Sequence, residues 1–90
     1  MVMASTQRLL LQALLTGLGD AVRRNDELAA DRYHRRLRLI APHFDTNPLI
    51  SDALKRLLSA SGRWSATKAA ERHEADQQVL ENIQYVMDLV

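Results

Sequence analysis

Residues 45–58, with the sequence DTNPLISDALKRLL, contain the clearest helix boundary in the chain. Asn47 is a favourable N-cap and Pro48 suits the first position of a helix, so the sequence predicts that a helix begins here. Apolar residues then recur at helical spacing, at Ile50, Leu54 and Leu57, with Leu58 and Trp64 further along.

Upstream of this boundary, residues 26–44 predict an amphipathic helix. Its apolar side chains fall within one arc of a helical wheel, at Ala30, Tyr33, Leu37, Ile40 and Phe44. Pro42 ends the regular part at Ile40 or Ala41, because the residue before a proline is biased away from the α region.

A further helix is predicted near the amino terminus, capped by Ser5 or Thr6. One of its faces is apolar, at Leu11, Leu14, Leu15, Leu18 and Val22. Gly17 and Gly19 weaken this helix by about 1 kcal/mol each relative to Ala, and we expect the chain to break or bend between Gly19 and Asp26.

Downstream, residues 59–62 (SASG) favour a break or kink, with Ser65 or Thr67 capping a fourth helix. The alternative is one unbroken helix that contains an unfavourable glycine. The last segment, residues 68–89, has one apolar side, at Ala69, Val79, Leu80, Ile83, Val86, Met87 and Val90. Strand-like alternation is missing, so we predict an all-α fold: a small antiparallel bundle of three to four helices in a single domain over residues 1–90.

Composition agrees with a small helical domain. The 90 residues are 47% hydrophobic and include three Gly and two Pro, too apolar for a disordered chain and too poor in turn residues for a β-sandwich. Twelve basic against eleven acidic residues give a net charge of +1, so no global field attracts nucleic acid or an anionic membrane. The apolar run at residues 9–18 is too short to span a membrane and lacks a cleavage site, so we expect a cytoplasmic protein without membrane insertion.

The sequence offers little for catalysis, metals or cofactors. It has no Cys, and the zinc motif that His73 and Glu74 begin has Gln77 where the second His is required. Two pairs of potential ligands lie one turn apart, Asp31 with His34 and His73 with Asp76. We expect both histidines to lie at the border between core and solvent instead. Phosphate-loop and serine-nucleophile signatures are missing, so we expect neither an enzyme nor a cofactor.

Two surfaces are candidates for binding. Apolar residues remain after each helix has buried one face, at Leu9, Leu10, Leu39, Tyr85 and Leu89. This surplus predicts a docking surface for another helix or protomer, although scattered surface leucines are also normal. Trp64 is either a partner anchor or, more often for a lone Trp in a small helical protein, part of the core.

The second surface is a basic ridge formed by Arg32, Arg35 and Arg36, opposite the buried stripe of residues 26–44. Such a ridge contacts phosphates or an acidic partner, or is simply a solvated helix face supported by pairing between Asp31 and Arg35. Recognition of DNA is disfavoured because the helix after Asn47 offers only two basic residues.

Three segments carry a resemblance to a known family: residues 11–22, residues 26–40 with DEL at 26–28 and YHRRL at 33–37, and DALKRLL at 52–58. Their order resembles the FliT family of short helical chaperones of bacterial flagellar and type III secretion. The resemblance implies a cytoplasmic chaperone that masks an aggregation-prone helix of an export substrate. In that mechanism the client helix docks on Leu80, Ile83, Tyr85, Val86 and Met87.

The leading hypothesis is therefore a non-enzymatic protein-binding module, a small bacterial secretion chaperone. The alternative is a small bacterial or phage regulator that binds nucleic acid or an acidic partner through Arg32, Arg35 and Arg36. A homodimer built on the C-terminal helix would use the same residues as the client site.

Overall fold

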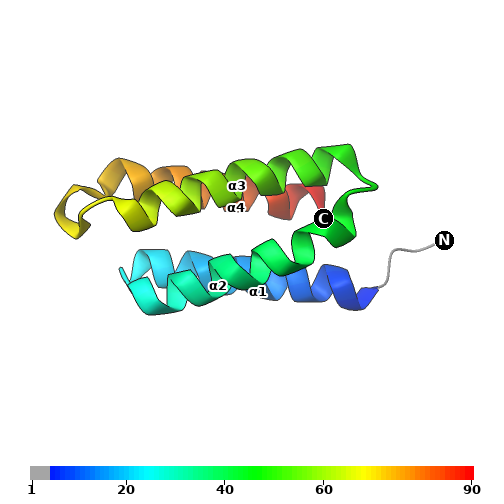
Figure 1. The fold of residues 1–90 in the computed structure, drawn as a ribbon, viewed down its shortest axis with the longest axis horizontal. Coiled ribbons are helices and arrows are strands. Elements are labelled where there is room, and N and C mark those ends of the chain that lie inside the picture. Colours follow the sequence, from blue (N-terminus) through cyan, green and yellow to red (C-terminus); the bar gives the residue numbers. More distant parts are fainter. Residues whose placement is uncertain (1–4) are drawn as a thin grey trace.

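Residues 5–90, the part of the chain that the computed structural model describes, form four α-helices and two short 3-10 turns (Figure 1). The elements are α1 (Ser5–Arg23), α2 (Glu27–Ile40), η1 (Ala41–Phe44), α3 (Pro48–Ala66), η2 (Ala69–Glu71) and α4 (His73–Leu89). No strand occurs among these residues, and the predicted all-α bundle is confirmed.

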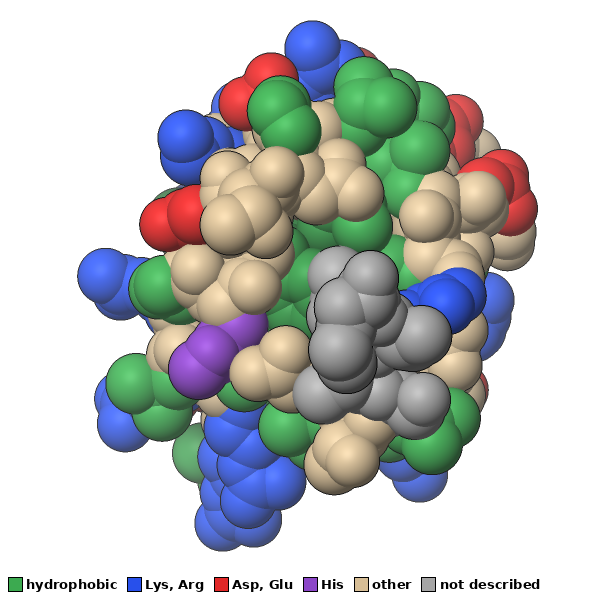
Figure 2. Space-filling view, turned by 90° about the vertical axis from the view of Figure 1, so that its right-hand side faces the viewer, with side chains coloured by type: hydrophobic (Ala, Val, Ile, Leu, Met, Phe, Trp, Pro, Cys, Tyr) green, Lys and Arg blue, Asp and Glu red, His purple; other side chains and the backbone are tan. Residues whose placement is uncertain are grey.

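The helices run alternately up and down in a rod of 46 × 20 × 19 Å. Both α1 and α3 pack against α2 and α4, so α2 and α4 occupy diagonally opposite corners. The α1–α2 turn and the α3–α4 connection meet at one end of the rod (Figure 1). The other end holds the α2–α3 connection and the carboxyl terminus, and Figure 2 looks onto it.

The core consists of the predicted apolar faces. Leu11, Leu15, Leu18, Leu37, Phe44 and Leu57 are fully buried. Trp64 is also fully buried, so it is a core residue and not an exposed anchor. Among the described residues, Arg72 is the one ionisable side chain inside this core.

Local chemistry sets two helix starts. The side chain of Asn47 accepts a hydrogen bond from the backbone N–H of Ile50 at 3.3 Å, and α3 begins at Pro48 as predicted. Asp26 caps α2 in the same way, accepting from the N–H of Ala29 at 3.1 Å. Between α1 and α2 the chain turns through Asn25, whose φ of 55° lies in the left-handed region that Asn tolerates.

The predicted break at residues 59–62 is wrong, because α3 continues to Ala66. Gly62 faces solvent with no atom within 4 Å of the place where a Cβ would stand. Continuing the helix buries Ser61 and Trp64, and burying the large Trp64 side chain outweighs the cost of about 1 kcal/mol for one glycine. The fourth helix consequently begins at His73, and neither Ser65 nor Thr67 caps it.

Gly17 and Gly19 lie within an unbroken α1, and Gly17 lets a neighbouring helix approach closely. A Cβ at Gly17 would overlap the ring of Tyr33 in α2. At Gly19 the side chains of Leu80 and Ile83 in α4 come within 3.8 and 3.7 Å of the Cβ position. Gly17 therefore sets how closely α2 packs against α1, whereas a Cβ at Gly19 would make only ordinary contact with α4.

Candidate protein-binding surface

The residues predicted to bind a client on α4 do not share one surface. Val86 is fully buried and Ile83 is only 8% exposed, so both belong to the core. Docking through these two residues would require α4 to leave the bundle. The prediction that Ile83 and Val86 form an exposed face for a client is therefore wrong for the closed bundle. These two side chains fill the core and cannot contact a partner at the same time.

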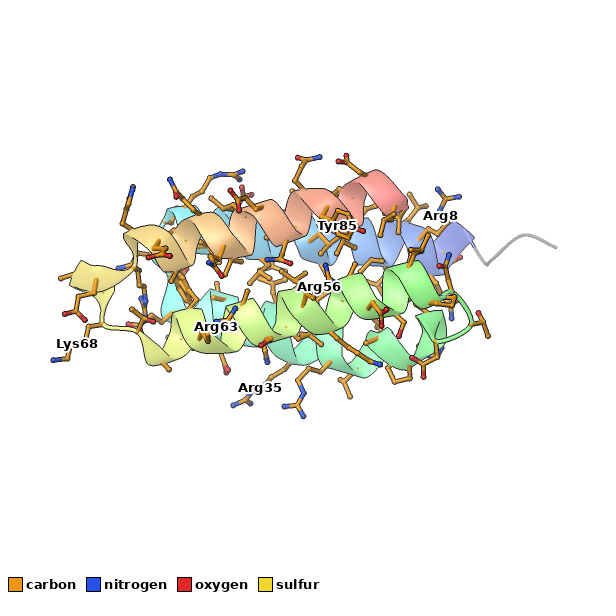
Figure 3. All side chains as sticks on the ribbon, turned by 90° about the horizontal axis from the view of Figure 1, so that it is seen from above. Arg8, Arg35, Arg56, Arg63, Lys68 and Tyr85 are labelled. Carbon is orange, nitrogen blue, oxygen red and sulfur yellow. The ribbon has the colours of Figure 1, made fainter. Side chains whose placement is uncertain are left out.

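The other three residues of that prediction lie on two sides of α4. Leu80 and Met87 are half-buried along a groove of about 230 Å³ between α1 and α4, which Leu15 and Gly19 also line. Tyr85 is 47% exposed and lies on the outer side of the α3–α4 layer (Figure 3). The client site on α4 stays a prediction, and the closed bundle offers only these separate pieces of it.

The arginine ridge, by contrast, lies on one exposed face of α2. Arg32, Arg35 and Arg36 are all exposed, and Arg35 projects away from the bundle in Figure 3. Arg35 pairs with Asp31 at 3.1 Å. Within residues 5–90, neither Arg32 nor Arg36 has a carboxylate within 4 Å. Two guanidinium groups are thus available to acidic groups of another molecule.

Two exposed leucines extend this ridge. Leu28 is 78% and Leu39 is 76% exposed, the highest fractions among the large apolar side chains of the described residues. Spacings of four, three and four residues place Leu28, Arg32, Arg35 and Leu39 on one helix face, over about 16 Å. We call these four residues, with the adjacent Arg36, the α2 outer stripe. It combines apolar ends with a basic centre.

The arginines and Leu39 were predicted from the sequence, whereas Leu28 and the exposed Leu49 were not. The signal for Leu28 was present, because it precedes Arg32 by one helical turn on the face opposite Ala30 and Leu37. Exposure at Leu49 follows from its place in the first turn of α3, one residue after Pro48.

A second group that sequence analysis missed surrounds Arg72, whose exposed fraction is 3%. Its Nε donates to the backbone oxygen of Trp64 at 3.0 Å, and its guanidinium carbon lies 4.0 Å from the centre of the Trp64 ring. Its two remaining nitrogens donate to Asn25 at 2.7 Å and to Glu27 at 2.8 Å. Trp64 Nε1 in turn donates to Asp76 at 2.5 Å.

We call these five residues the Arg72 cluster, formed by Asn25, Glu27, Trp64, Arg72 and Asp76. Every hydrogen-bonding nitrogen of Arg72 has a partner, and no buried side-chain N or O atom in the described residues is left without one. The cluster therefore joins the two helix pairs, and each polar atom of the Arg72 guanidinium is already engaged within the chain.

The histidine pairs are not assembled into a metal site. Among the described residues, no three His, Asp or Glu side chains are placed to hold a metal ion. His34 lies at the core border, as expected, with its Nδ1 2.9 Å from the Ser61 hydroxyl, and burial and then the nearby Arg38 lower its pKa. His73 is exposed, contrary to expectation, because α4 begins there and directs it away from the core.

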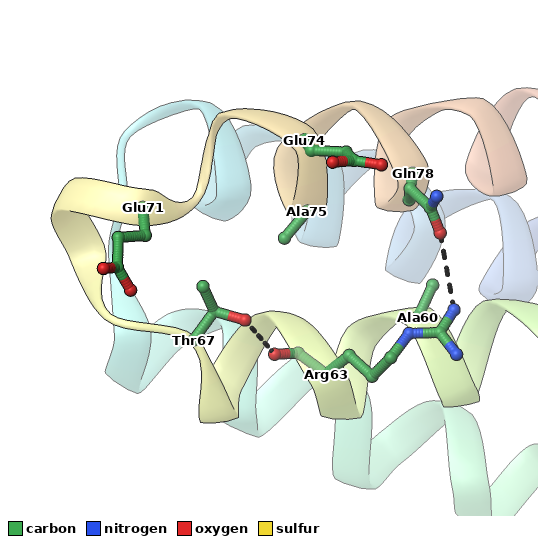
Figure 4. Close-up of a pocket in the computed structure, with 7 residues that line it drawn as sticks. All are labelled: Ala60, Arg63, Thr67, Glu71, Glu74, Ala75 and Gln78. Carbon is green, nitrogen blue, oxygen red and sulfur yellow. Dashed lines mark hydrogen bonds between the residues drawn. The ribbon is translucent and has the colours of Figure 1, made fainter.

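A hollow of about 260 Å³ lies between α3 and α4 (Figure 4). Its polar walls include Arg63, which donates to Gln78 at 3.4 Å, and the exposed carboxylates of Glu71 and Glu74. No buried polar group points into it, so it is a solvated hollow. The α2 outer stripe is the stronger candidate.

Comparison with protein-family models, curated proteins and solved structures finds no match to this chain. None of the helices in residues 5–90 combines the length and apolar character needed to cross a membrane. The structure thus defines the class as a small antiparallel four-helix bundle, and function has to be argued from its surface.

Proposed function

We propose that the protein is a non-enzymatic binding module that holds an acidic amphipathic helix of a partner protein on the α2 outer stripe. The main observation in support is that Leu28 and Leu39 are exposed on one helix face, on either side of Arg32 and Arg35. Apolar anchors one to three turns apart are how a helix recognises another helix.

Apolar burial and charge contribute differently to such a complex. Complete burial of one leucine side chain is worth about 1.5–3 kcal/mol, so the two leucines supply most of the affinity. Ion pairs at the solvated edge of an interface contribute about 0–1 kcal/mol each and mainly raise the association rate and select acidic partners. We therefore assign anchoring to Leu28 and Leu39 and selectivity to Arg32, Arg35 and Arg36.

The resemblance to FliT-like chaperones specifies this proposal further. It would make the partner an exported subunit and place the protein in the bacterial cytoplasm. In its support the three segments that carry the resemblance lie in three successive helices, α1, α2 and α3. In this version the client would use the α2 outer stripe, because Ile83 and Val86 are occupied by the core.

A regulator that binds nucleic acid is the second candidate, favoured by the absence of ion pairs at Arg32 and Arg36 within the described part of the chain. Phosphate contacts would account for the arginines but leave Leu28 and Leu39 uncovered. A protein partner accounts for both residue types, and we favour it for that reason.

The test is fluorescence anisotropy with a designed helical peptide that carries Leu and Glu on one face, and separately with a DNA duplex. Leu28→Asp with Leu39→Asp should weaken peptide binding about tenfold or more, since two anchors are lost and two like charges are added. Leu9→Asp with Leu49→Asp is the matched control, because both are exposed leucines outside α2 and their replacement adds the same charge, so binding should be unchanged.

Either of two results would contradict the proposal. One is undiminished peptide binding by the folded double variant. The other is tighter binding of the DNA duplex, with an affinity that falls steeply as salt is raised, the signature of counterion release.

A further inference from the structure

The four helices divide the charge of the molecule unevenly. α2 carries four arginines against Glu27 and Asp31, a net charge of +2 with His34 neutral. α4 carries four carboxylates and neither Lys nor Arg, a net charge of −4 with His73 neutral. The chain as a whole is almost neutral, at +1. It therefore has a basic edge and an acidic edge without a net charge that would keep copies apart.

The acidic residues of α4 also share one outward face. Glu74, Glu81 and Asp88 are exposed, and their spacing of seven residues places them opposite the buried Val79, Ile83 and Val86. Tyr85 lies on the same face as a large exposed apolar side chain. We call Glu74, Glu81, Tyr85 and Asp88 the α4 outer stripe, which extends over about 21 Å.

The α4 outer stripe has the chemistry that the α2 outer stripe is proposed to bind. It offers three carboxylates without an ion pair among the described residues, and one aromatic ring. The two stripes cannot meet within one chain, because α2 and α4 lie on diagonally opposite corners (Figures 1 and 3). Two copies can bring them together.

We infer, resting on the proposed function, that the partner helix is α4 of a second copy of this chain. Leu28 and Leu39 lie about 16 Å apart along α2, so one of them packs against Tyr85 of the next copy. The arginines between the two leucines then face the carboxylates of the α4 outer stripe. The contact between leucine and aromatic ring anchors the helices, while the charged pairs fix the register.

This contact joins two different surfaces, so it is head-to-tail and leaves one free α2 outer stripe and one free α4 outer stripe on an assembly of any length. Because the stripes face opposite corners, the assembly grows as an open chain rather than closing as a two-fold dimer. A contact between two helices of this length is smaller than the roughly 1,200–2,000 Å² of stable interfaces. Association is consequently weak, reversible and sensitive to salt.

The test is sedimentation velocity of the full chain over a concentration series, at about 0.01 M and about 1 M salt, between which the screening length falls from about 30 to about 3 Å. We expect species larger than a dimer at high protein concentration and low salt, and monomer at high salt. Adding the designed acidic peptide should dissociate these species, because it occupies the α2 outer stripe.

Charge reversal identifies the surfaces. The α2-reversed variant carries Arg32→Glu, Arg35→Glu and Arg36→Glu, and the α4-reversed variant carries Glu74→Arg, Glu81→Arg and Asp88→Arg. Each alone should associate about tenfold more weakly or not at all, since its two stripes have the same sign. A chain with all six changes has the original net charge and complementary stripes, so association should return.

Arg24→Glu, Lys55→Glu and Arg56→Glu together form the matched control, because they change net charge as the α2-reversed variant does and leave both stripes intact. This variant should still associate. Circular dichroism establishes that each variant keeps its helices.

A chain that stays monomeric at all concentrations and low salt overturns the inference, as does a closed dimer or association that the reversed variants retain. Peptide binding to the monomeric chain would then still support the proposed function. Loss of peptide binding together with intact self-association would remove the proposed function, and would also remove the α2 outer stripe as the self-interface.

Discussion

The two ends of the bundle are closed in different ways. At one end, the Arg72 cluster joins the α1–α2 turn to the α3–α4 connection through hydrogen bonds and a guanidinium stacked on Trp64. At the other end, the fully buried Phe44 and the half-buried Leu89 and Val90 close the structure by apolar contact. At the polar end most of the contacts that join the segments involve one side chain, Arg72, whereas at the apolar end several side chains share them.

The largest effect that separates the two ends is expected from truncating their aromatic residues. Trp64→Ala should lower the free energy of unfolding by about 5 kcal/mol and Phe44→Ala by about 3–4 kcal/mol, both within the range for large buried aromatics. The difference arises because Trp64→Ala also removes the ring beneath Arg72 and the donor to Asp76. Urea denaturation measures both, and equal losses would contradict the distinction between the ends.

The next largest loss of stability is expected from Arg72→Met. Met fills much of the same volume but removes three hydrogen bonds and the contact with the Trp64 ring, so we expect a loss of about 2–4 kcal/mol. Arg8→Met at the opposite end is the control, since Arg8 is exposed and bonds only to the backbone oxygen of Val90. It should change stability by less than about 0.5 kcal/mol, and similar losses for both variants would show that the cluster is not special.

At the apolar end, the cap of α3 is the most localised polar contribution. Asn47→Ala removes the acceptor for the N–H of Ile50 and should cost about 1 kcal/mol. Asn47→Asp keeps a capping oxygen and should cost less. Thermal unfolding of both variants measures this order, and the reverse order would show that Asn47 stabilises by another route.

The smallest expected effect is an increase in the free energy of unfolding. Gly62→Ala should stabilise the protein by about 0.5–1 kcal/mol, because the glycine sits in a regular helix with open space where the methyl group would stand. Gly17→Ala is the contrasting control and should destabilise, since its methyl group would overlap the Tyr33 ring. Stabilisation by both changes would mean that the α1–α2 spacing adapts freely.

Sequence predicted the parts of the fold that depend on neighbours in the chain. The Asn47 cap and the stop before Pro42 were found because a cap or a proline acts within one helical turn. The continuation of α3 through Gly62 was not found, because it depends on burial of Trp64 against segments distant in sequence. Arg72 was not found for the same reason, since its partners lie 45 and 47 residues away.

In the candidate site, too, features set by neighbours in the chain were predicted and features set by packing between distant segments were not. The arginines of α2 were predicted because an exposed face is simply the complement of a buried one. Ile83 and Val86 were misplaced because the same apolar spacing describes a stripe that fills the core and a stripe that binds a partner. Only the packing of α4 against α1 and α3 separates the two cases.

The Arg72 cluster also has a consequence for the order in which the chain folds. The α1–α2 and α3–α4 pairs each form contacts between neighbouring segments, which cost little loop entropy. The contacts of Asn25 and Glu27 with Arg72 form only after both pairs have met, and we expect these two contacts to form late in folding. Stopped-flow experiments on Arg72→Met should therefore show an unfolding rate that rises more than the folding rate falls, so this side chain sets the lifetime of the folded bundle.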